Sequence, residues 1–179
     1  MILLLFIIAL FCFFSLMSIV FWTIRNGISP MPSSIKVKKI LFSQALPIQV
    51  KGPILELGSA WGSLAIPLAK RYPKTRVIGY ETSPIPYWIS RLLAFLLQLK
   101  NLTLVKQDFF EADFGNAALI LCYLYPGAMK KLKLKFEKEL MPGTIIISHT
   151  FAIPSWQAET ILTVPDLYQT KIYIYKFSS

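Results

Sequence analysis

The sequence predicts an α/β domain on a mostly parallel sheet, with an antiparallel hairpin at its C-terminal end and one transmembrane helix before it. Three observations predict this fold. Residues 2–24 form an apolar stretch without charge. Strand-like runs then alternate with helical patterns, and such alternation is typical of parallel sheets that helices cover on both faces. The last two strand-like runs have no helix between them, which favours a hairpin at the sheet edge.

The apolar stretch at residues 2–24 is long enough to cross a membrane, because about 20 helical residues span the hydrocarbon core. A cleaved signal peptide would need a basic start, a shorter apolar core and a small-residue cleavage site. None of these is evident in the sequence. We therefore expect a retained single-pass anchor at residues 1–25, a juxtamembrane linker at residues 26–51 and the folded domain at residues 52–179.

Basic residues follow the apolar stretch and predict its orientation. Five of them precede the first acidic residue, Glu56: Arg25, Lys36, Lys38, Lys39 and Lys51. Loops rich in Lys and Arg stay on the cytoplasmic side, so we expect the domain on the cytoplasmic side of a bacterial inner membrane, or in the matrix at a mitochondrial inner membrane. The net charge of +10 suits a surface resting on anionic lipid. Nucleic acid is the other interpretation of a basic surface, but the anchor favours lipid, and no nucleic-acid partner is expected.

The remaining elements follow in a regular order. Within the linker, which contains Pro30, Pro32 and Pro47, a short helix is expected around residues 35–42. Apolar runs then predict strands at residues 54–57, 76–80, 103–106, 118–123, 144–148, 161–164 and 171–177. Helical patterns separate most of them, at residues 62–71, 84–99 and 127–140. The last two strands are joined through Pro165 and Asp166 and predict the terminal hairpin.

Cysteine and histidine give little support to metal, thiol or triad chemistry. The chain has two cysteines, Cys12 in the apolar stretch and Cys122 in a second apolar run, and their spacing fits neither a zinc site nor a redox pair. No metal site is predicted. The single histidine, His149, is not accompanied by a nucleophile elbow, so a structural position at a strand end is favoured over a catalytic triad.

Acidic residues stand at the ends of three successive strands and outline a ligand site. Glu56 precedes the turn Gly58-Ser59-Ala60-Trp61-Gly62, Glu81 ends the second strand, and Asp108 follows the third. The carboxyl ends of parallel strands share one edge of the sheet, where nucleotide-like ligands bind. The turn adds backbone N–H groups at the start of a helix, so Gly58, Ser59 and Gly62 are expected to bind the ligand with these acids.

The spacing of the turn argues against a dinucleotide. The usual fingerprint is G-x-G-x-x-G, whereas here Gly58 and Gly62 are separated by three residues and Ala60 holds the middle position. Ala60 restricts the close approach of a pyrophosphate, and the carboxylate of Glu56 would repel phosphate. A ligand with an ammonium group, a ribose diol and an adenine but no phosphate fits better. S-adenosylmethionine has these groups.

Each acid is then expected to bind one part of this cofactor. Glu56 can hold the ammonium group directly or through water. Glu81, 23 residues after Gly58, can accept hydrogen bonds from both ribose hydroxyls. Asp108 is placed for the adenine amino group, with Phe109 covering the ring. An aspartate after a strand is also a common turn former or N-cap, and this alternative remains open for Asp108.

Four stretches of the chain resemble class I S-adenosylmethionine-dependent methyltransferases, which have a Rossmann-like sheet. More narrowly, the chain is similar to the small membrane-anchored protein-lysine methyltransferases of the adenine nucleotide translocase and the ATP synthase c subunit, and to their prokaryotic relatives. The stretches are Glu56–Gly62, Gly79–Arg91, Tyr123–Leu132 and Phe151–Trp156. The resemblance, which covers roughly Lys51 to Trp156, implies methyl transfer to lysine of a membrane or membrane-associated protein.

The resemblance also implies where the acceptor binds. Tyr125 and Pro126, at the end of the fourth strand, occupy the place where class I enzymes line the acceptor site. We expect Tyr125 and Pro126 to act in catalysis there, with Trp88 and Trp156 as candidate walls of the substrate site. Core packing or a position at the membrane interface is the alternative for both tryptophans.

Three positions depart from the family pattern. The family usually has glycine where Ala60 stands, an acidic residue where Trp61 stands and an arginine near Thr150. Ala60 and Trp61 support one alternative function, a degenerate membrane-tethered domain that binds partners. A second alternative keeps the cofactor but transfers the methyl group to a lipid or another small molecule, which the anchor also permits.

Overall fold

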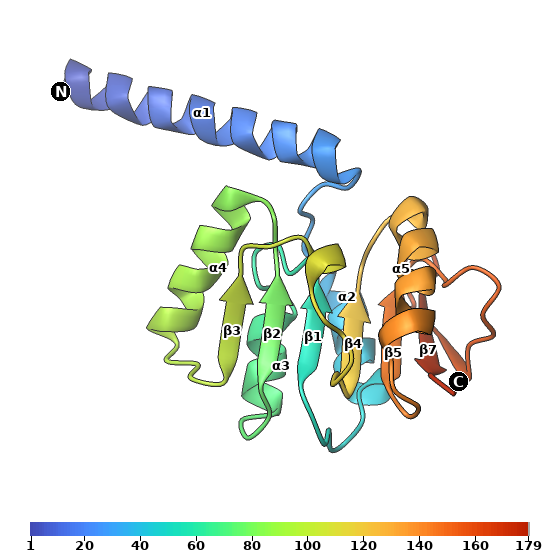
Figure 1. Ribbon diagram of the computed structural model, residues 1–179. Coiled ribbons are helices and arrows are strands. Elements are labelled where there is room, and N and C mark those ends of the chain that lie inside the picture. Colours follow the sequence, from blue (N-terminus) through green and yellow to red (C-terminus); the bar gives the residue numbers. More distant parts are fainter. Residues whose placement is uncertain (179) are drawn as a thin grey trace.

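The computed structural model describes residues 1–178 and shows a seven-stranded sheet between helices (Figure 1). The strands are β1 (Ile54–Leu57), β2 (Val77–Tyr80), β3 (Leu102–Val105), β4 (Leu119–Cys122), β5 (Ile145–His149), β6 (Thr160–Thr163) and β7 (Lys171–Lys176). The helices are α1 (Ile2–Asn26), α2 (Ile35–Ile40), α3 (Ala65–Arg71), α4 (Pro84–Leu96) and α5 (Pro126–Glu139). A π-helical segment, η1 (Leu41–Ala45), continues α2, and η2 (Phe109–Glu111) is a short 3-10 helix. Every expected strand and helix is present, with shifted ends.

The order of the strands is β3-β2-β1-β4-β5-β7-β6. Strands β1 to β5 are parallel, whereas β7 is antiparallel to both β5 and β6. This confirms the mostly parallel sheet and its terminal antiparallel hairpin. From β1 the chain first builds the sheet toward β3 and then returns to add β4 on the other side of β1. Such a reversal marks the place where α/β proteins bind ligands.

Alternate residues of the central strands build two cores. On one face, Leu55 and Leu57 of β1 pack with Met129 and Phe136 of α5. On the other face, Ile54 packs among residues of α2, η1 and α3. Strands β1 and β4 are buried along their whole length, as expected for parallel strands covered on both faces. The exception to their apolar character is Glu56, a carboxylate inside the central strand.

Helix α1 extends away from the sheet (Figure 1) and has no buried residue. It is long and apolar enough to cross a membrane. It ends at Asn26 and is followed by Gly27, whose φ of 70° is a left-handed conformation that glycine adopts without strain. We call residues 27–34 the juxtamembrane segment; they run from α1 to Ser34, whose side chain caps α2.

The segment expected to be a linker is partly integrated into the domain. Val37, Leu41, Ala45 and Leu46 are buried in the core on the α3 side of the sheet. These residues cover apolar surface that the strands would otherwise expose to water. Residues of the expected linker therefore contribute to the core of the domain.

Candidate active site

The turn after β1 is fixed to the end of β2 by its backbone. The amides of Gly58 and Ser59 both donate to the carbonyl oxygen of Tyr80, at 3.0 and 2.8 Å. Gly58 and Gly62 have φ angles of 78° and 75°, and Ala60 between them has 44°. A non-glycine residue in this region is uncommon and costs energy. The neighbouring structure must therefore hold Ala60 in place.

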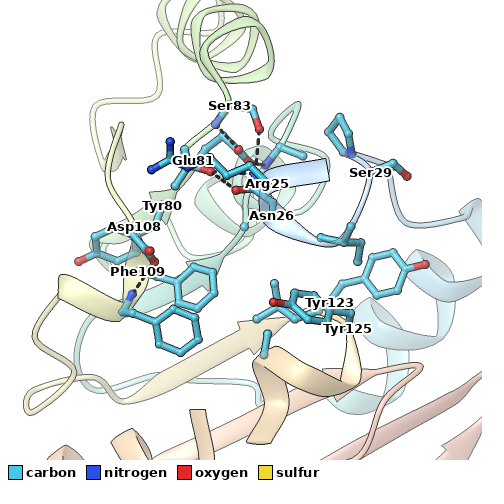
Figure 2. Close-up of a pocket in the computed structure, with 18 of the residues that line it drawn as sticks. Arg25, Asn26, Ser29, Tyr80, Glu81, Ser83, Asp108, Phe109, Tyr123 and Tyr125 are labelled. Atoms are coloured by element: carbon cyan, nitrogen blue, oxygen red, sulfur yellow. Dashed lines mark hydrogen bonds between the residues drawn. The ribbon is translucent and has the colours of Figure 1, made fainter. Parts of the chain in front are cut away.

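Glu81 supplies that hold. Its side chain is buried; one carboxylate oxygen accepts from the amide of Ala60 at 2.8 Å, and the other accepts from the amide of Ser83 at 2.6 Å. Figure 2 shows the carboxylate at the rim of a cleft, between the turn after β1 and the start of α4. Each oxygen keeps a further lone pair, so the carboxylate is positioned and can still accept bonds from a ligand.

A buried carboxylate with one unpartnered oxygen lies next to this rim. Within residues 1–178, two buried side-chain oxygens lack a hydrogen bond, Oε2 of Glu56 and Oγ of Ser59. Both residues line a small cavity together with Gly58 and Ala60. Burial raises the pKa of Glu56 well above its usual range, and the charge of Glu81 raises it further. A carboxylate oxygen left without a partner in such a place is a suitable acceptor for a small cationic group.

The third acid has a structural contact and also faces the cleft. Asp108 is the N-cap of η2, and its Oδ1 accepts from the amide of Phe110 at 2.9 Å. Asp108 is therefore an N-cap, which was the alternative role considered for it from the sequence. Asp108 and Phe109 nevertheless line the same cleft as Glu81. The two residues lie on the same side of the cleft (Figure 2), as a shared contact with an adenine would require.

The cleft has a volume of about 210 Å³ and crosses the carboxyl ends of β1, β2 and β4. Figure 2 shows Asp108 and Phe109 on one side of it and Tyr123 and Tyr125 on the other. Tyr125 is the N-cap residue of α5. Cofactor pockets usually enclose roughly 300–1,000 Å³, so this cleft is narrow. Its width is reduced by residues from the N-terminal part of the chain.

The end of α1 and the juxtamembrane segment form one wall of the cleft. The lining residues from this part are Arg25, Asn26, Ile28, Ser29, Pro30 and Met31. Asn26 donates to the hydroxyls of Thr82 and Ser83 at 2.9 and 3.2 Å. Gly27 lies against the ring of Tyr125, where an added Cβ would be 3.0 Å from Cζ. A side chain at this position would therefore displace the ring.

Two further contacts fix the segment to the domain. Trp61 donates its indole N–H to the carbonyl oxygen of Pro30, and the Ser33 hydroxyl lies 3.0 Å from Nε2 of His149. Trp61 is not among the residues that line the cleft, so its indole does not fill the place of a ligand. In this chain, Trp61 instead fastens the juxtamembrane segment across the sheet edge.

His149 is a buried strand-end residue, which agrees with the expectation from sequence. Its ring stacks on Tyr123, with centroids 4.0 Å apart. Burial lowers the pKa of His149 to about 4, so the imidazole is neutral near pH 7. The side chain thereby supports Tyr123, which lines the cleft.

Some predicted site residues lie elsewhere. Gly62 packs closely against Ile66 and Ser90, and Pro126 begins α5; neither lines the cleft. Trp88 is on the outer face of α4 and is 56% exposed. Trp156 packs against Phe136, Tyr175 and Phe177. The structure does not bring these two tryptophans to the cleft, because their elements present them to other surfaces.

Sequence reasoning missed several residues of the cleft. Tyr123 could have been found, because it precedes Tyr125 by two residues at a strand end and such residues share one side of the chain. Tyr80, Thr82, Ser83 and Lys131 also line the cleft. Tyr80, Thr82 and Ser83 lie beside Glu81 in the chain, whereas Lys131 lies within α5. The wall formed by the N-terminal residues had no comparable sequence signal.

Comparison with known proteins identifies the family. The model of the ANTKMT methyltransferase domain matches residues 56–160, more than half of the chain. The chain belongs to this family. It is an S-adenosylmethionine-dependent methyltransferase, as the resemblance implied.

Two relatives are named as lysine methyltransferases. The protein-lysine N-methyltransferase of Saccharolobus islandicus is 29% identical over 119 residues, which cover 63% of this chain and 71% of that protein. The adenine nucleotide translocase lysine N-methyltransferase of Mus musculus is 23% identical over 112 residues, 62% of this chain. The alignment spans only 48% of the mouse protein.

A solved structure agrees with the fold of the methyltransferase. An RNA methyltransferase from Salinibacter ruber, in complex with S-adenosyl-L-homocysteine, superimposes with a TM-score of 0.71 and 25% identity. The match covers 82% of this chain and 93% of that one. A putative methyltransferase from Escherichia coli gives a TM-score of 0.68 at 16% identity, which supports the fold alone.

The residues present fit S-adenosylmethionine. The unpartnered Oε2 of Glu56 suits a cationic ammonium group, and the fixed carboxylate of Glu81 is placed to accept hydroxyl bonds. Phe109 offers an aromatic face beside Asp108. The cleft also holds the cations Arg25 and Lys131, which can balance the cofactor's own carboxylate. These assignments of single residues are predictions.

Proposed function

We propose that this methyltransferase modifies lysine side chains of a membrane or membrane-associated protein. Two named relatives are lysine methyltransferases, and α1 would hold the enzyme at a membrane. The basic residues after α1 favour the cytoplasmic side, or the matrix side in a mitochondrion. The observation that carries the proposal is the tyrosine pair, Tyr123 and Tyr125. It faces an acidic rim, formed by Glu81 and Asp108, across the cleft.

In this proposal the acidic rim binds the methyl donor. Glu56 pairs with the ammonium group, Glu81 accepts bonds from the ribose hydroxyls, and Asp108 with Phe109 binds the adenine. The turn at Gly58 and Ser59 supplies close backbone contact. When bound, S-adenosylmethionine supplies an electrophilic methyl group on a positively charged sulfur.

The tyrosine side of the cleft would bind the acceptor. Tyrosine faces attract an alkylammonium group and the methylene chain that carries it. Arg25 and Lys131 place positive charge in the same cleft, and nearby like charge favours the neutral amine. The lysine proton leaves to solvent before transfer. Transfer would form a C–N bond from the nitrogen lone pair while the S–C bond breaks, and the positive charge would pass from sulfur to nitrogen.

Positioning dominates such a displacement, since it needs little acid–base assistance. The two reacting atoms must approach to about 3–3.5 Å in line. Tyr125 is fixed at the start of α5 and under Gly27, so its ring cannot turn freely. Residues of the juxtamembrane segment line the cleft beside it. We therefore assign acceptor orientation to Tyr125.

The test uses the full chain in native membranes with S-adenosylmethionine that carries a tritiated methyl group. Protein and lipid are separated after the reaction, and labelled protein is hydrolysed to identify methyl-lysine. We expect label on lysine. Label in the lipid fraction would support the alternative acceptor class instead. Cofactor binding without transfer to either fraction would support the degenerate binding domain.

A matched pair of variants connects the activity to the cleft. Tyr125→Ala removes the proposed acceptor contact and should lower kcat/KM about 10-fold or more, which corresponds to roughly 1.4 kcal/mol. Tyr168→Ala is the control, because Tyr168 is 85% exposed and lies between β6 and β7. Equal activity of the two variants would contradict the placement of the acceptor at Tyr125.

A further inference from the structure

Helix α4 has its large apolar side chains on the outside. The face that packs on the domain is formed by Pro86, Tyr87, Ser90 and Ala94. Ser90 and Ala94 are small, and Ser90 meets Gly62 in the turn after β1. Surface helices of proteins in water normally show the opposite pattern, with apolar residues toward the core.

The outward face of α4 and its C-cap is almost entirely apolar. Its side chains, with their exposed fractions, are Trp88 56%, Ile89 41%, Leu92 57%, Leu93 40%, Phe95 78%, Leu96 65% and Leu97 44%. Arg91 is the single charged residue of the helix, and its guanidinium lies 5.3 Å from the centroid of the Trp88 ring. A contiguous apolar patch of this kind marks contact with another apolar phase.

Helix α5, which packs on the same sheet, does not share this exposure. Its exposed positions include Lys130, Lys131 and Lys138, and Leu134 is its one large exposed apolar residue. The two helices flank the same sheet (Figure 1). The domain therefore has a polar outer surface on α5 and an apolar one on α4.

Helix α4 adjoins the apolar helix α1. The two helices are in contact, and Figure 1 shows α1 passing over the N-terminal end of α4. At this junction, Asn26 of α1 donates to the hydroxyl of Ser83, the N-cap residue of α4. The exposed apolar face of α4 thus continues the apolar surface of α1.

We propose that the outer face of α4 inserts into the membrane interface beside α1. The inference rests on the membrane anchoring proposed above. A bilayer explains the whole face, because it offers an apolar phase along the length of the helix. Tryptophan and arginine are favoured where apolar core meets headgroup, and Trp88 with Arg91 forms such a pair. An interfacial helix buries its apolar face about 5–10 Å into this boundary.

Insertion of α4 would fix the cleft relative to the membrane. The helix begins at Pro84, directly after the hydrogen-bonded pair of Glu81 and Ser83. The cofactor rim would therefore lie close to the headgroups. A lysine that reaches the cleft would have to be near the membrane surface.

The test places a nitroxide label at single cysteines of the full chain, reconstituted in nanodiscs of phosphatidylcholine and phosphatidylglycerol. The background carries Cys12→Ser, while the buried Cys122 stays unlabelled. Leu92→Cys and Leu96→Cys probe α4, Leu134→Cys on α5 is the water-exposed control, and Leu10→Cys reports the anchor. All four native side chains are at least 45% exposed. Collisions with oxygen and with a water-soluble nickel complex measure membrane depth.

We expect the ratio of oxygen to nickel collisions at positions 92 and 96 to exceed that at position 134 several-fold. If positions 92 and 96 resemble 134 while position 10 reports acyl chains, α4 is outside the bilayer and the anchor stands. If position 10 also resembles 134, membrane anchoring itself is refuted, and this inference with it. Spin–spin broadening at 92 and 96 that disappears on dilution with unlabelled chain would show a second copy on α4 and would overturn the inference.

Discussion

The substitution Glu81→Gln tests the central carboxylate of the cleft. In the structure its two oxygens accept from two buried amides, those of Ala60 and Ser83. Glutamine keeps one acceptor oxygen, so one amide loses a charged acceptor and faces an NH₂ group. A hydrogen bond to a charged group contributes roughly 1.5–3 kcal/mol. We expect the free energy of unfolding to fall by about 2 kcal/mol and Tm by about 4–8 °C.

The same substitution should weaken cofactor binding. If Glu81 accepts bonds from the ribose, replacing the charged acceptor should raise the Kd for S-adenosylmethionine about 10- to 100-fold. Calorimetry with the detergent-solubilised full chain measures Kd, and thermal unfolding measures stability. Glu111→Gln is the matched control, since its side chain is exposed in η2. An unchanged Kd in a folded Glu81→Gln variant would refute the ribose assignment.

Three further perturbations follow from the site. Trp61→Phe removes the indole hydrogen bond to the carbonyl oxygen of Pro30. It should lower the free energy of unfolding by about 0.5–1.5 kcal/mol and speed limited proteolysis within residues 27–34. An unchanged cleavage rate would show that this hydrogen bond does not hold the segment in place. Burial lowers the pKa of His149 to about 4, so the unfolded chain binds this proton before the folded one does as pH falls from 6.5. Urea titrations should show that the free energy of unfolding falls by about 3 kcal/mol by pH 4. If His149→Gln shows the same dependence of stability on pH, His149 is not its source. Because burial raises the pKa of Glu56, the charged fraction of this side chain increases with pH, and affinity for the cofactor should increase with it. Glu56→Gln should bind the cofactor more weakly and with little dependence on pH. If the variant keeps the pH dependence of the unchanged protein, Glu56 does not bind the ammonium group.

The fold could be predicted because its signals are local. Apolar runs such as residues 54–57 are buried on both faces, and this burial needs the helices that alternate with them. The lack of a helix between β6 and β7 was enough to predict the antiparallel hairpin. The ends of helices were less certain: α3 begins at Ala65 because Gly62, with its left-handed φ, still belongs to the turn.

The acidic side of the cleft could also be predicted, because parallel strands end at one edge and bring Glu81 and Asp108 to the same cleft. Glu56 lies in the small cavity next to it. The opposite wall could not. Its contacts, such as the indole of Trp61 on the carbonyl of Pro30, join residues 31 positions apart through one backbone atom. The spacing of apolar residues in the sequence does not predict such a contact. Aromatic identity was likewise a poor guide, as Trp88 shows, because it does not indicate which surface of a helix a ring occupies.

The wall contributed by residues 25–31 affects how the enzyme should be prepared for assay. A shortened chain that begins near Lys36 would be easier to handle without detergent. It would also lack Arg25, Asn26 and the stretch over Tyr125, which would leave the cleft open on one side. Weak turnover by such a shortened protein would result from the missing wall of the cleft and would not show that the intact enzyme is inactive. Intact chains in lipid are therefore the proper starting material for measurements on this enzyme.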